Sequence, residues 1–100
     1  MDNVKLVRPK ILAASHILVR QEFEARDLLK KLEAGVSFES LARDFSECSS
    51  AKHDGYLGLF NPKQMVPEFV RALLLLKEGE ITLKPVKSQF GYHLIRREKP

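Results

Sequence analysis

Apolar residues near the start of the chain form two patterns, one typical of a strand and one typical of a helix. Residues 11–20 are rich in apolar and β-branched types, which predicts a strand. Residues 22–34 carry apolar side chains three and four positions apart, which predicts a helix whose buried face consists of Ala25, Leu28, Leu29 and Leu32. Gly35 follows directly and suits the left-handed position at which many helices end.

The helical spacing returns after Gly35 and predicts a second helix over residues 37–46. Ser37 is suited to the N-cap, and Glu39 is favourable in the first turn. The predicted buried face consists of Phe38, Leu41, Ala42 and Phe45. The polar residues 46–58 predict a loop with one short helical turn, and residues 56–60 predict a brief strand.

The last third of the chain predicts one more helix and two strands. Pro67 suits the first turn of a helix that Gly79 ends, with a buried face made of Val66, Phe69, Val70, Leu73 and Leu76. Residues 81–87 and 90–97 predict two strands joined by a turn near Ser88 and Gln89. This order of elements predicts an α+β fold, with a four-stranded, mostly antiparallel sheet surrounded by three to four helices.

Length and composition restrict the possible classes of protein. One hundred residues suit a single domain, 1–100, with its core at about 13–97, and we expect a monomer. The single cysteine excludes an internal disulfide, and the three scattered histidines give no metal-ligand spacing, so we expect neither a metal nor a cofactor. The net charge of +4 is spread among 13 acidic residues, so we expect no nucleic acid as a partner.

Membrane and targeting signals are also missing from the pattern. No apolar run approaches the roughly 20 residues that span a bilayer. Residues 1–10 lack the apolar region of a secretory signal. We therefore expect a cytoplasmic protein if the chain is complete, and an extracytoplasmic one if it is a domain excised from a longer secreted or membrane-anchored protein.

A series of short motifs resembles the parvulin family of peptidyl-prolyl cis/trans isomerases in order and spacing. The motifs are His16-Ile17-Leu18-Val19, Gly35-Val36-Ser37-Phe38, Leu41-Ala42, Ser46-Glu47-Cys48-Ser49-Ser50-Ala51-Lys52, Gly55-Tyr56-Leu57-Gly58-Leu59-Phe60, Gln64-Met65-Val66-Pro67-Glu68-Phe69, Gly79-Glu80-Ile81 and Phe90-Gly91-Tyr92-His93-Leu94-Ile95. They cover about residues 13–97. The chain departs from the family pattern at Asp54, where a Gly is common, at Tyr56, where an Asp is common, and by one extra residue within 82–85.

The resemblance implies an enzyme that accelerates rotation about Xaa-Pro bonds of polypeptide substrates and assists protein folding. It implies a proline pocket formed by Leu57, Met65 and Phe69, with Gln64 and Phe90 at its border. Met65 and Phe69 could instead be ordinary core residues, as their spacing alone suggests.

The same resemblance implies a polar group of four residues, His16, Cys48, Ser88 and His93. We expect the two histidines to meet beneath the site if the first and last strands pair, and to organise hydrogen bonds without carrying protons. They could equally be buried structural histidines. Ser88 is expected to hydrogen-bond to His16 or Cys48, and Cys48 to act electrostatically beside the amide carbonyl, because many relatives carry Asp there.

Two other functions remain open on the sequence. The fold could serve as a non-catalytic peptide-binding or chaperone module. A cysteine hydrolase using Cys48 and His93 is the second alternative, although no nucleophile-elbow motif surrounds Cys48. Among isomerases we expect no phosphate preference, because Arg20 stands alone between the first strand and the first helix, where relatives that select phosphate carry a basic loop.

Overall fold

The computed structural model describes residues 10–100, so the prediction that residues 1–10 lack a signal sequence falls almost wholly outside the described residues. The described elements are β1 (Leu12–Val19), α1 (Glu22–Glu33), α2 (Phe38–Phe45), the 3-10 turn η1 (Ser49–His53), β2 (Tyr56–Phe60), the 3-10 turn η2 (Pro62–Gln64), α3 (Pro67–Leu74), β3 (Val86–Ser88) and β4 (Gly91–Glu98). Within residues 10–100, no helix is long and apolar enough to cross a membrane.

The four strands form one sheet in the order β2-β1-β4-β3. The three pairings, β1 with β2, β1 with β4, and β3 with β4, are antiparallel. The predicted α+β class and the four-stranded sheet are therefore confirmed, with β1 and β4 as the central pair.

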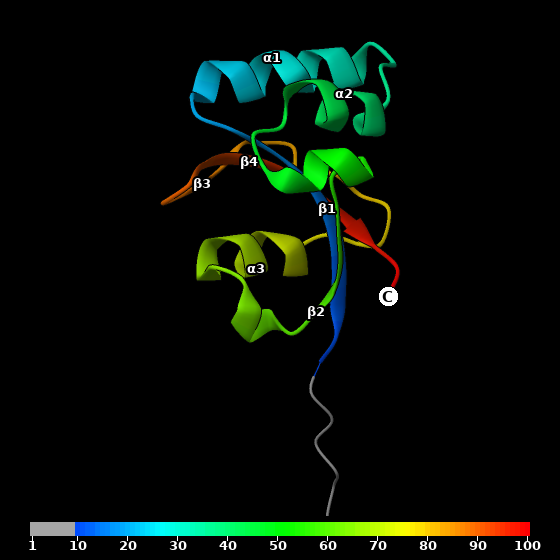
Figure 1. Cartoon of the computed structure of the whole chain (residues 1–100), viewed down its shortest axis with the longest axis vertical. Helices are drawn as coiled ribbons and strands as arrows, with labels where there is room; N and C mark the ends of the chain where they lie inside the picture. The colour runs from blue at the N-terminus through cyan, green and yellow to red at the C-terminus, as the bar shows by residue number, and fades with distance from the viewer. Residues whose placement is uncertain (1–9) are drawn as a thin grey trace, which may run out of the picture.

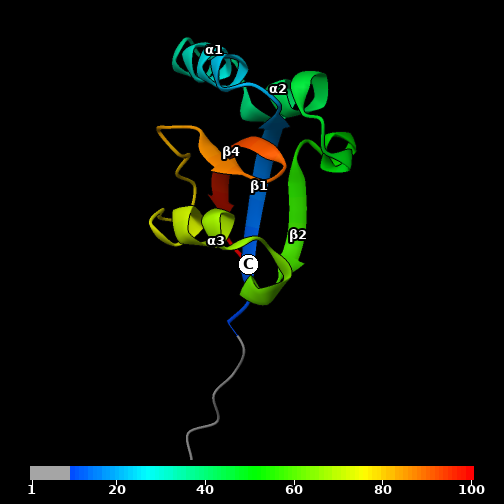
Figure 2. The ribbon, with the colours of Figure 1, turned by 90° about the vertical axis from the view of Figure 1, so that its left-hand side faces the viewer.

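The helices cover the two faces of this sheet (Figures 1 and 2). Figure 1 shows α1 and α2 above β3 and β4 and α3 below them, with β1 and β2 running down past α3. Because successive side chains of a strand point to opposite faces, β1 contributes to two separate cores. Beneath α1 and α2 the core consists of Ile17, Val19, Ala25, Leu28, Phe38, Leu41, Ala42 and Leu94. Beneath α3 it consists of Leu12, Ala14, Phe60, Phe69, Leu73 and Ile95.

Local sequence signals explain how the first two helices begin and end. The Ser37 hydroxyl accepts a hydrogen bond from the backbone N–H of Ser40 at 3.1 Å, which confirms the predicted N-cap of α2. The Glu24 carboxylate accepts from the backbone N–H of Gln21 at 3.0 Å and so stabilises the start of α1. Gly35 adopts φ +100°, as expected for a residue that ends a helix.

The C-terminal third departs from the sequence prediction in two elements. Helix α3 ends at Leu74, before the predicted end at Gly79. The strand predicted over 81–87 is reduced to β3, and Ile81 makes only an isolated bridge to Arg96. Between Ile81 and Val86 four residues face only two of β4, so regular pairing is interrupted there. Within this stretch the Thr82 side-chain Oγ1 accepts from the backbone N–H of Ile95 at 3.0 Å.

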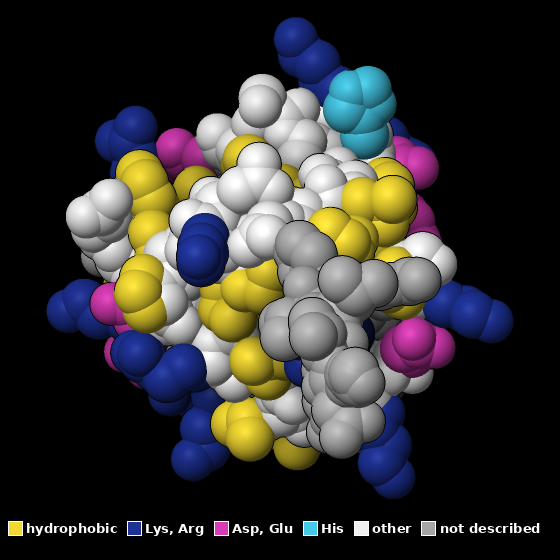
Figure 3. Space-filling model, turned by 90° about the horizontal axis from the view of Figure 1, so that it is seen from below, with side chains coloured by type: hydrophobic (Ala, Val, Ile, Leu, Met, Phe, Trp, Pro, Cys, Tyr) yellow, Lys and Arg dark blue, Asp and Glu magenta, His cyan; other side chains and the backbone are white. Residues whose placement is uncertain are grey.

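Charged side chains are distributed widely over the surface. The face seen in Figure 3 carries Lys and Arg side chains around its rim, with Asp and Glu among them and hydrophobic side chains between. On this face the basic residues are interspersed with acidic ones, as the sequence suggested. His53, expected at the surface, is exposed on η1.

Candidate functional site

An open cavity of about 350 Å³ lies on the α3 face of the sheet. Its walls are mostly apolar, and they come from β1, β2, β4, the N-terminal part of α3 and the segments before η1 and α3. The lining residues are His16, Leu18, Cys48, Leu57, Gln64, Met65, Val66, Phe69, Phe90 and His93. Every site residue expected from the sequence lines this cavity except Ser88.

The register between β1 and β4 brings the two histidines together. Leu18 pairs with His93 and His16 pairs with Ile95, so the histidines are diagonal neighbours on one face of the sheet. Their Nδ1 atoms lie 3.0 Å apart and their rings stack with centroids 5.2 Å apart. The expectation that the first and last strands pair and bring the rings together is confirmed.

The Phe69 ring supports both imidazoles. It meets His16 edge-on at 5.6 Å between centroids and His93 at 5.5 Å. Phe69 is 2% exposed and belongs to the core beneath α3, yet it also lines the cavity. The two interpretations offered by the sequence, core and pocket, therefore describe the same side chain.

Ser88 lies behind His93 and not at the cavity wall. Its hydroxyl is 2.6 Å from His93 Nε2, and it accepts from the backbone N–H of Phe90 at 3.2 Å. The expectation of a bond to His16 or Cys48 is wrong. Because Ser88 pairs with Gly91 in the β3–β4 hairpin, its side chain is a diagonal neighbour of His93, the second histidine.

Both imidazoles are neutral at neutral pH. Burial, together with the nearby His93, lowers the pKa of His16 to about 4. Burial also lowers the pKa of His93 to about 4, against an opposing effect of Glu68. One proton therefore joins the two Nδ1 atoms, and His16 Nε2 is buried without a hydrogen-bond partner among residues 10–100.

Cys48 is held beside the end of β1 by its own segment. The backbone N–H of Leu18 donates to the Ser46 hydroxyl at 3.0 Å, and the N–H of Glu47 donates to the Leu18 carbonyl at 2.7 Å. Cys48 is half-buried at the cavity wall. His93, the base of the hydrolase alternative, has its two nitrogens next to His16 and Ser88, so it is not arranged to activate this thiol.

The loop that precedes β2 accommodates the unusual Asp54. Asp54 adopts φ +59° and Gly55 φ +87°, a left-handed pair in which Gly is favoured and Asp is tolerated. Arg43 bonds the Asp54 carboxylate at 2.7 Å. A Cβ at Gly55 would lie 2.6 Å from the His16 carbonyl oxygen, so this glycine permits the loop to approach β1. Tyr56, 43% exposed at the start of β2, is not among the cavity residues.

Two lining residues, Leu18 and Val66, were not among the expected site residues. Leu18 could have been found, because strand alternation puts it on the same face as His16. Val66 was assigned to the buried face of a helix, whereas it is the N-cap residue of α3 and lies half-buried at the cavity.

This arrangement is typical of a protein that binds and orients a segment of polypeptide. An open apolar cavity with an aromatic ring beneath neutral polar groups is suited to hold an apolar part of a polypeptide. The histidines are buried and neutral, so the site favours binding and orientation over proton transfer.

Comparison with known proteins identifies the family. The model of the rotamase family, the PPIC-type PPIase domain, matches residues 13–99. The foldase protein PrsA of Geobacillus kaustophilus is 46% identical over 96 residues, which are 95% of this chain and 32% of the foldase. The chain therefore belongs to the parvulin-type, or PpiC-type, peptidyl-prolyl cis/trans isomerase family.

Solved structures agree with this assignment. The parvulin NmPin of Nitrosopumilus maritimus is 40% identical with a TM-score of 0.78, over 93% of this chain and all of that one. A Campylobacter jejuni structure, from a study of PEB4 and the periplasmic protein Cj1289 as SurA-like chaperones, is 39% identical with a TM-score of 0.85, over 92% of this chain and 39% of that one. The chain spans about a third of the curated foldase it matches.

Proposed function

We propose that the apolar cavity grips the proline ring of an Xaa-Pro segment and that the domain accelerates rotation about the preceding peptide bond. The observation that carries this is the apolar cavity with two neutral histidines and a half-buried thiol at its wall. In this proposal residues 13–97 form the catalytic unit and act as a monomer on proline-containing polypeptides.

The chemistry of the reaction fits such a site. Amide resonance gives a barrier of roughly 18–20 kcal/mol, and no lasting covalent bond is made or broken. A catalyst must therefore bind the twisted amide better than either planar form. A cavity that holds the ring and excludes water from the amide weakens the solvation of the planar forms, because resonance gives their carbonyl oxygen more negative charge than it has in the twisted bond.

The proposal assigns a role to each group of lining residues, and their positions at the cavity support it. Leu57, Met65 and Phe69 would enclose the proline ring, with Gln64 and Phe90 at the border.

Cys48 would face the amide carbonyl and act electrostatically. His16, His93 and Ser88 would orient the polar wall as one hydrogen-bonded group. Neutral histidines suit this role, because rotation about the amide requires no net proton transfer.

A preference for phosphate before proline is not part of this proposal. Arg20 is the single arginine between β1 and α1, and it pairs with Glu47 at 3.0 Å. Arg26, the next arginine, pairs with Glu22 at 2.6 Å. Both guanidinium groups thus have a carboxylate partner already, and a phosphate would have to compete with it.

The whole protein would act as a foldase outside the cytoplasm. This is supported by the similarity to the foldase PrsA and to the structure whose description names a periplasmic, SurA-like chaperone. Fractionation of the source cells with an antibody to this domain tests the location, and recovery with the cytoplasmic markers would contradict it.

Exchange spectroscopy tests the activity. A proline peptide with an apolar or basic residue before proline should show faster cis/trans exchange at catalytic concentrations of the protein. Unchanged exchange at saturating protein, with binding still visible in the peptide spectrum, would favour the non-catalytic peptide-binding module.

A further inference from the structure

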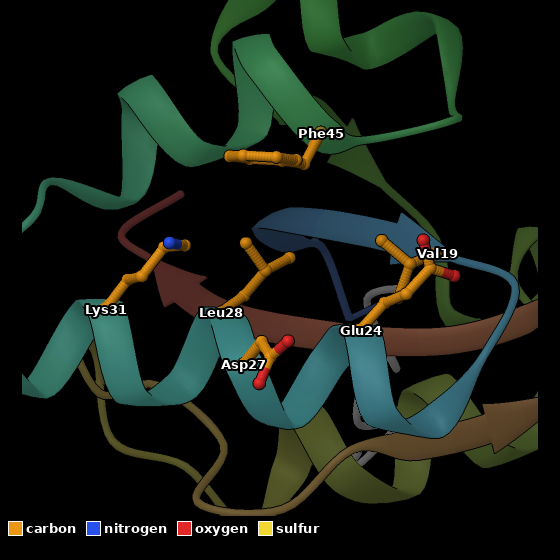
Figure 4. A pocket seen from close by; sticks show the side chains of 6 residues that line it. All are labelled: Val19, Glu24, Asp27, Leu28, Lys31 and Phe45. Atoms are coloured by element: carbon orange, nitrogen blue, oxygen red, sulfur yellow. The ribbon is translucent and has the colours of Figure 1, made fainter.

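A second cavity, of about 270 Å³, lies between α1 and α2 (Figure 4). Leu28 points from α1 into the gap, and Phe45 covers it from α2. Lys31 lies toward one end of the cleft, and Glu24 lies toward the other, beside Val19. We call this cavity the α1–α2 cleft.

The α1–α2 cleft is separate from the proline cavity. Val19 lines the cleft and its neighbour Leu18 lines the proline cavity, and adjacent residues of a strand point to opposite faces of the sheet. The sheet therefore lies between the two sites at this end of β1. A ligand in the cleft does not occupy the space in which proline would bind.

Phe45 has an exposure that the fold does not require. Its spacing from Leu41 and Ala42 predicted a buried position, but Phe45 is 48% exposed while the other two are buried. The aromatic ring therefore covers the cleft instead of completing the core. Covering it with an apolar ligand would remove apolar surface from water, which is favourable.

The charges around the cleft differ between its two ends. Glu24 and Asp27 lie in the N-terminal half of α1, and Lys31 follows one turn later. Neither Asp27 nor Lys31 forms a salt bridge with another of residues 10–100. A ligand with a positive group at one end and a negative group at the other would match this arrangement.

The dimensions match an extended polypeptide. The Cα atoms of Glu24 and Lys31 are seven helical residues apart, which is roughly 10 Å along α1. In an extended chain, residues i, i+2 and i+4 point to one side and span roughly 13 Å. Three alternate side chains of such a chain therefore fit the cleft. A basic one would lie at the acidic end, a large apolar one in the gap, and an acidic one beside Lys31.

We propose that the α1–α2 cleft docks an extended segment of the client polypeptide that presents this basic–apolar–acidic pattern. The inference rests on the proposed function, since the cleft would be a second binding site for the polypeptide whose prolyl bonds the domain isomerises. The cleft would keep the client bound while successive prolines enter and leave the proline cavity on the other face of the sheet.

The test uses a peptide without proline, acetyl-Gly-Lys-Ala-Phe-Ala-Glu-Gly-amide, titrated into the isotope-labelled chain. Amide shifts should concentrate at Val19, Lys31 and Phe45. Replacement of the peptide's Phe by Ala should abolish them. Shifts concentrated at Met65 and Phe69 would instead assign the peptide to the proline cavity and overturn the proposal.

Variants separate the cleft from the rest of α1 and α2. Phe45→Ala should weaken peptide binding about tenfold, as truncation of an aromatic contact at the centre of an interface does. The matched control is Phe23→Ala, which removes a 67% exposed aromatic residue of α1 that does not line the cleft and should leave binding unchanged. Lys31→Glu should reverse the preference for the acidic residue, so that a Lys-Ala-Phe-Ala-Lys peptide binds better than the original.

Prolyl exchange measured on the same samples keeps the two proposals distinguishable. Phe45→Ala should isomerise short proline peptides at the wild-type rate, which also shows that it is folded. If the wild-type chain isomerises proline peptides but binds no proline-free peptide, the docking proposal is overturned and the proposed isomerase activity stands. Shifts at Phe45 that depend on protein concentration without peptide would assign the cleft to a second copy of the chain, and would overturn it as well.

Discussion

Acidification should destabilise this domain through its two buried histidines. The pKa of each falls from 6.5 to about 4 on folding. Between these values the unfolded chain binds protons that the native chain does not, so the free energy of unfolding decreases as the pH falls through this window. The contribution of the two neutral histidines to stability is fully present above the pKa of the unfolded chain. It is lost as the pH falls toward the pKa of the folded chain.

The magnitude follows from the two pKa values. Between about pH 7.5 and pH 5, protonation stabilises an unfolded histidine by about 2 kcal/mol, while a native histidine of pKa near 4 gains almost nothing. The pair should therefore cost roughly 4 kcal/mol of stability, a large part of the 5–15 kcal/mol typical of a domain. The negative charge of Glu68 raises the pKa of His93, and the value of about 4 already includes this opposing effect.

Urea unfolding followed by circular dichroism at several pH values measures this loss. His16→Asn or His93→Asn should lower stability at neutral pH and reduce the pH dependence by half or more. His53→Gln is the matched control, because His53 is exposed and its removal should leave the pH dependence unchanged. A wild-type loss below about 1 kcal/mol would refute the assignment of neutral, buried histidines.

The remaining predictions concern the proposed site. Phe69→Ala should lower the rate of prolyl exchange and reduce the free energy of unfolding in urea by roughly 3–5 kcal/mol, since it empties both the pocket and the core. A stable, fully active variant would show that the proline pocket has been assigned to the wrong residues. Cys48→Asp should retain substantial exchange activity, because a carboxylate can supply the same electrostatic effect. Complete loss of activity in a folded variant, together with a covalent adduct on Cys48 of the wild-type protein, would favour covalent chemistry. Matched Ser-Pro and phospho-Ser-Pro peptides should exchange at similar rates, and a phosphopeptide advantage of about a hundredfold, or about 2.7 kcal/mol, would disprove the argument from Arg20 and Glu47.

Much of the fold could be predicted because local patterns and tertiary packing agree. The strand at 12–19 alternates between two cores, the α2 cap is local to Ser37 and Ser40, and the helical spacing of α1 coincides with its buried face. Such signals involve residues close in sequence, so they can be recognised without knowing the fold. The family resemblance added the set of cavity residues, which spacing alone left divided between core and pocket.

The parts that could not be predicted depend on contacts between distant segments. The strand expected at 81–87 is interrupted where residues 82–85 face only two residues of β4, and Ser88 meets His93 because of the hairpin register. Phe45 has the spacing of a core residue, yet the gap between α1 and α2 leaves it half exposed. None of these three outcomes follows from a local pattern, since each is decided by the partner that the segment meets.

The central strand connects the two proposed binding sites in a way that limits how they can influence each other. Leu18 and Val19 are adjacent on β1, one at the proline cavity and one at the α1–α2 cleft. At these two residues β1 pairs with β4 on one side, and the Leu18 backbone bonds Ser46 and Glu47 on the other. The side chains of β1 are almost all buried. Because a closely packed sheet resists deformation, occupation of one site should change the other little. Binding of one client at both sites would then keep the client polypeptide near the proline cavity. This raises the client's effective concentration there without any conformational change.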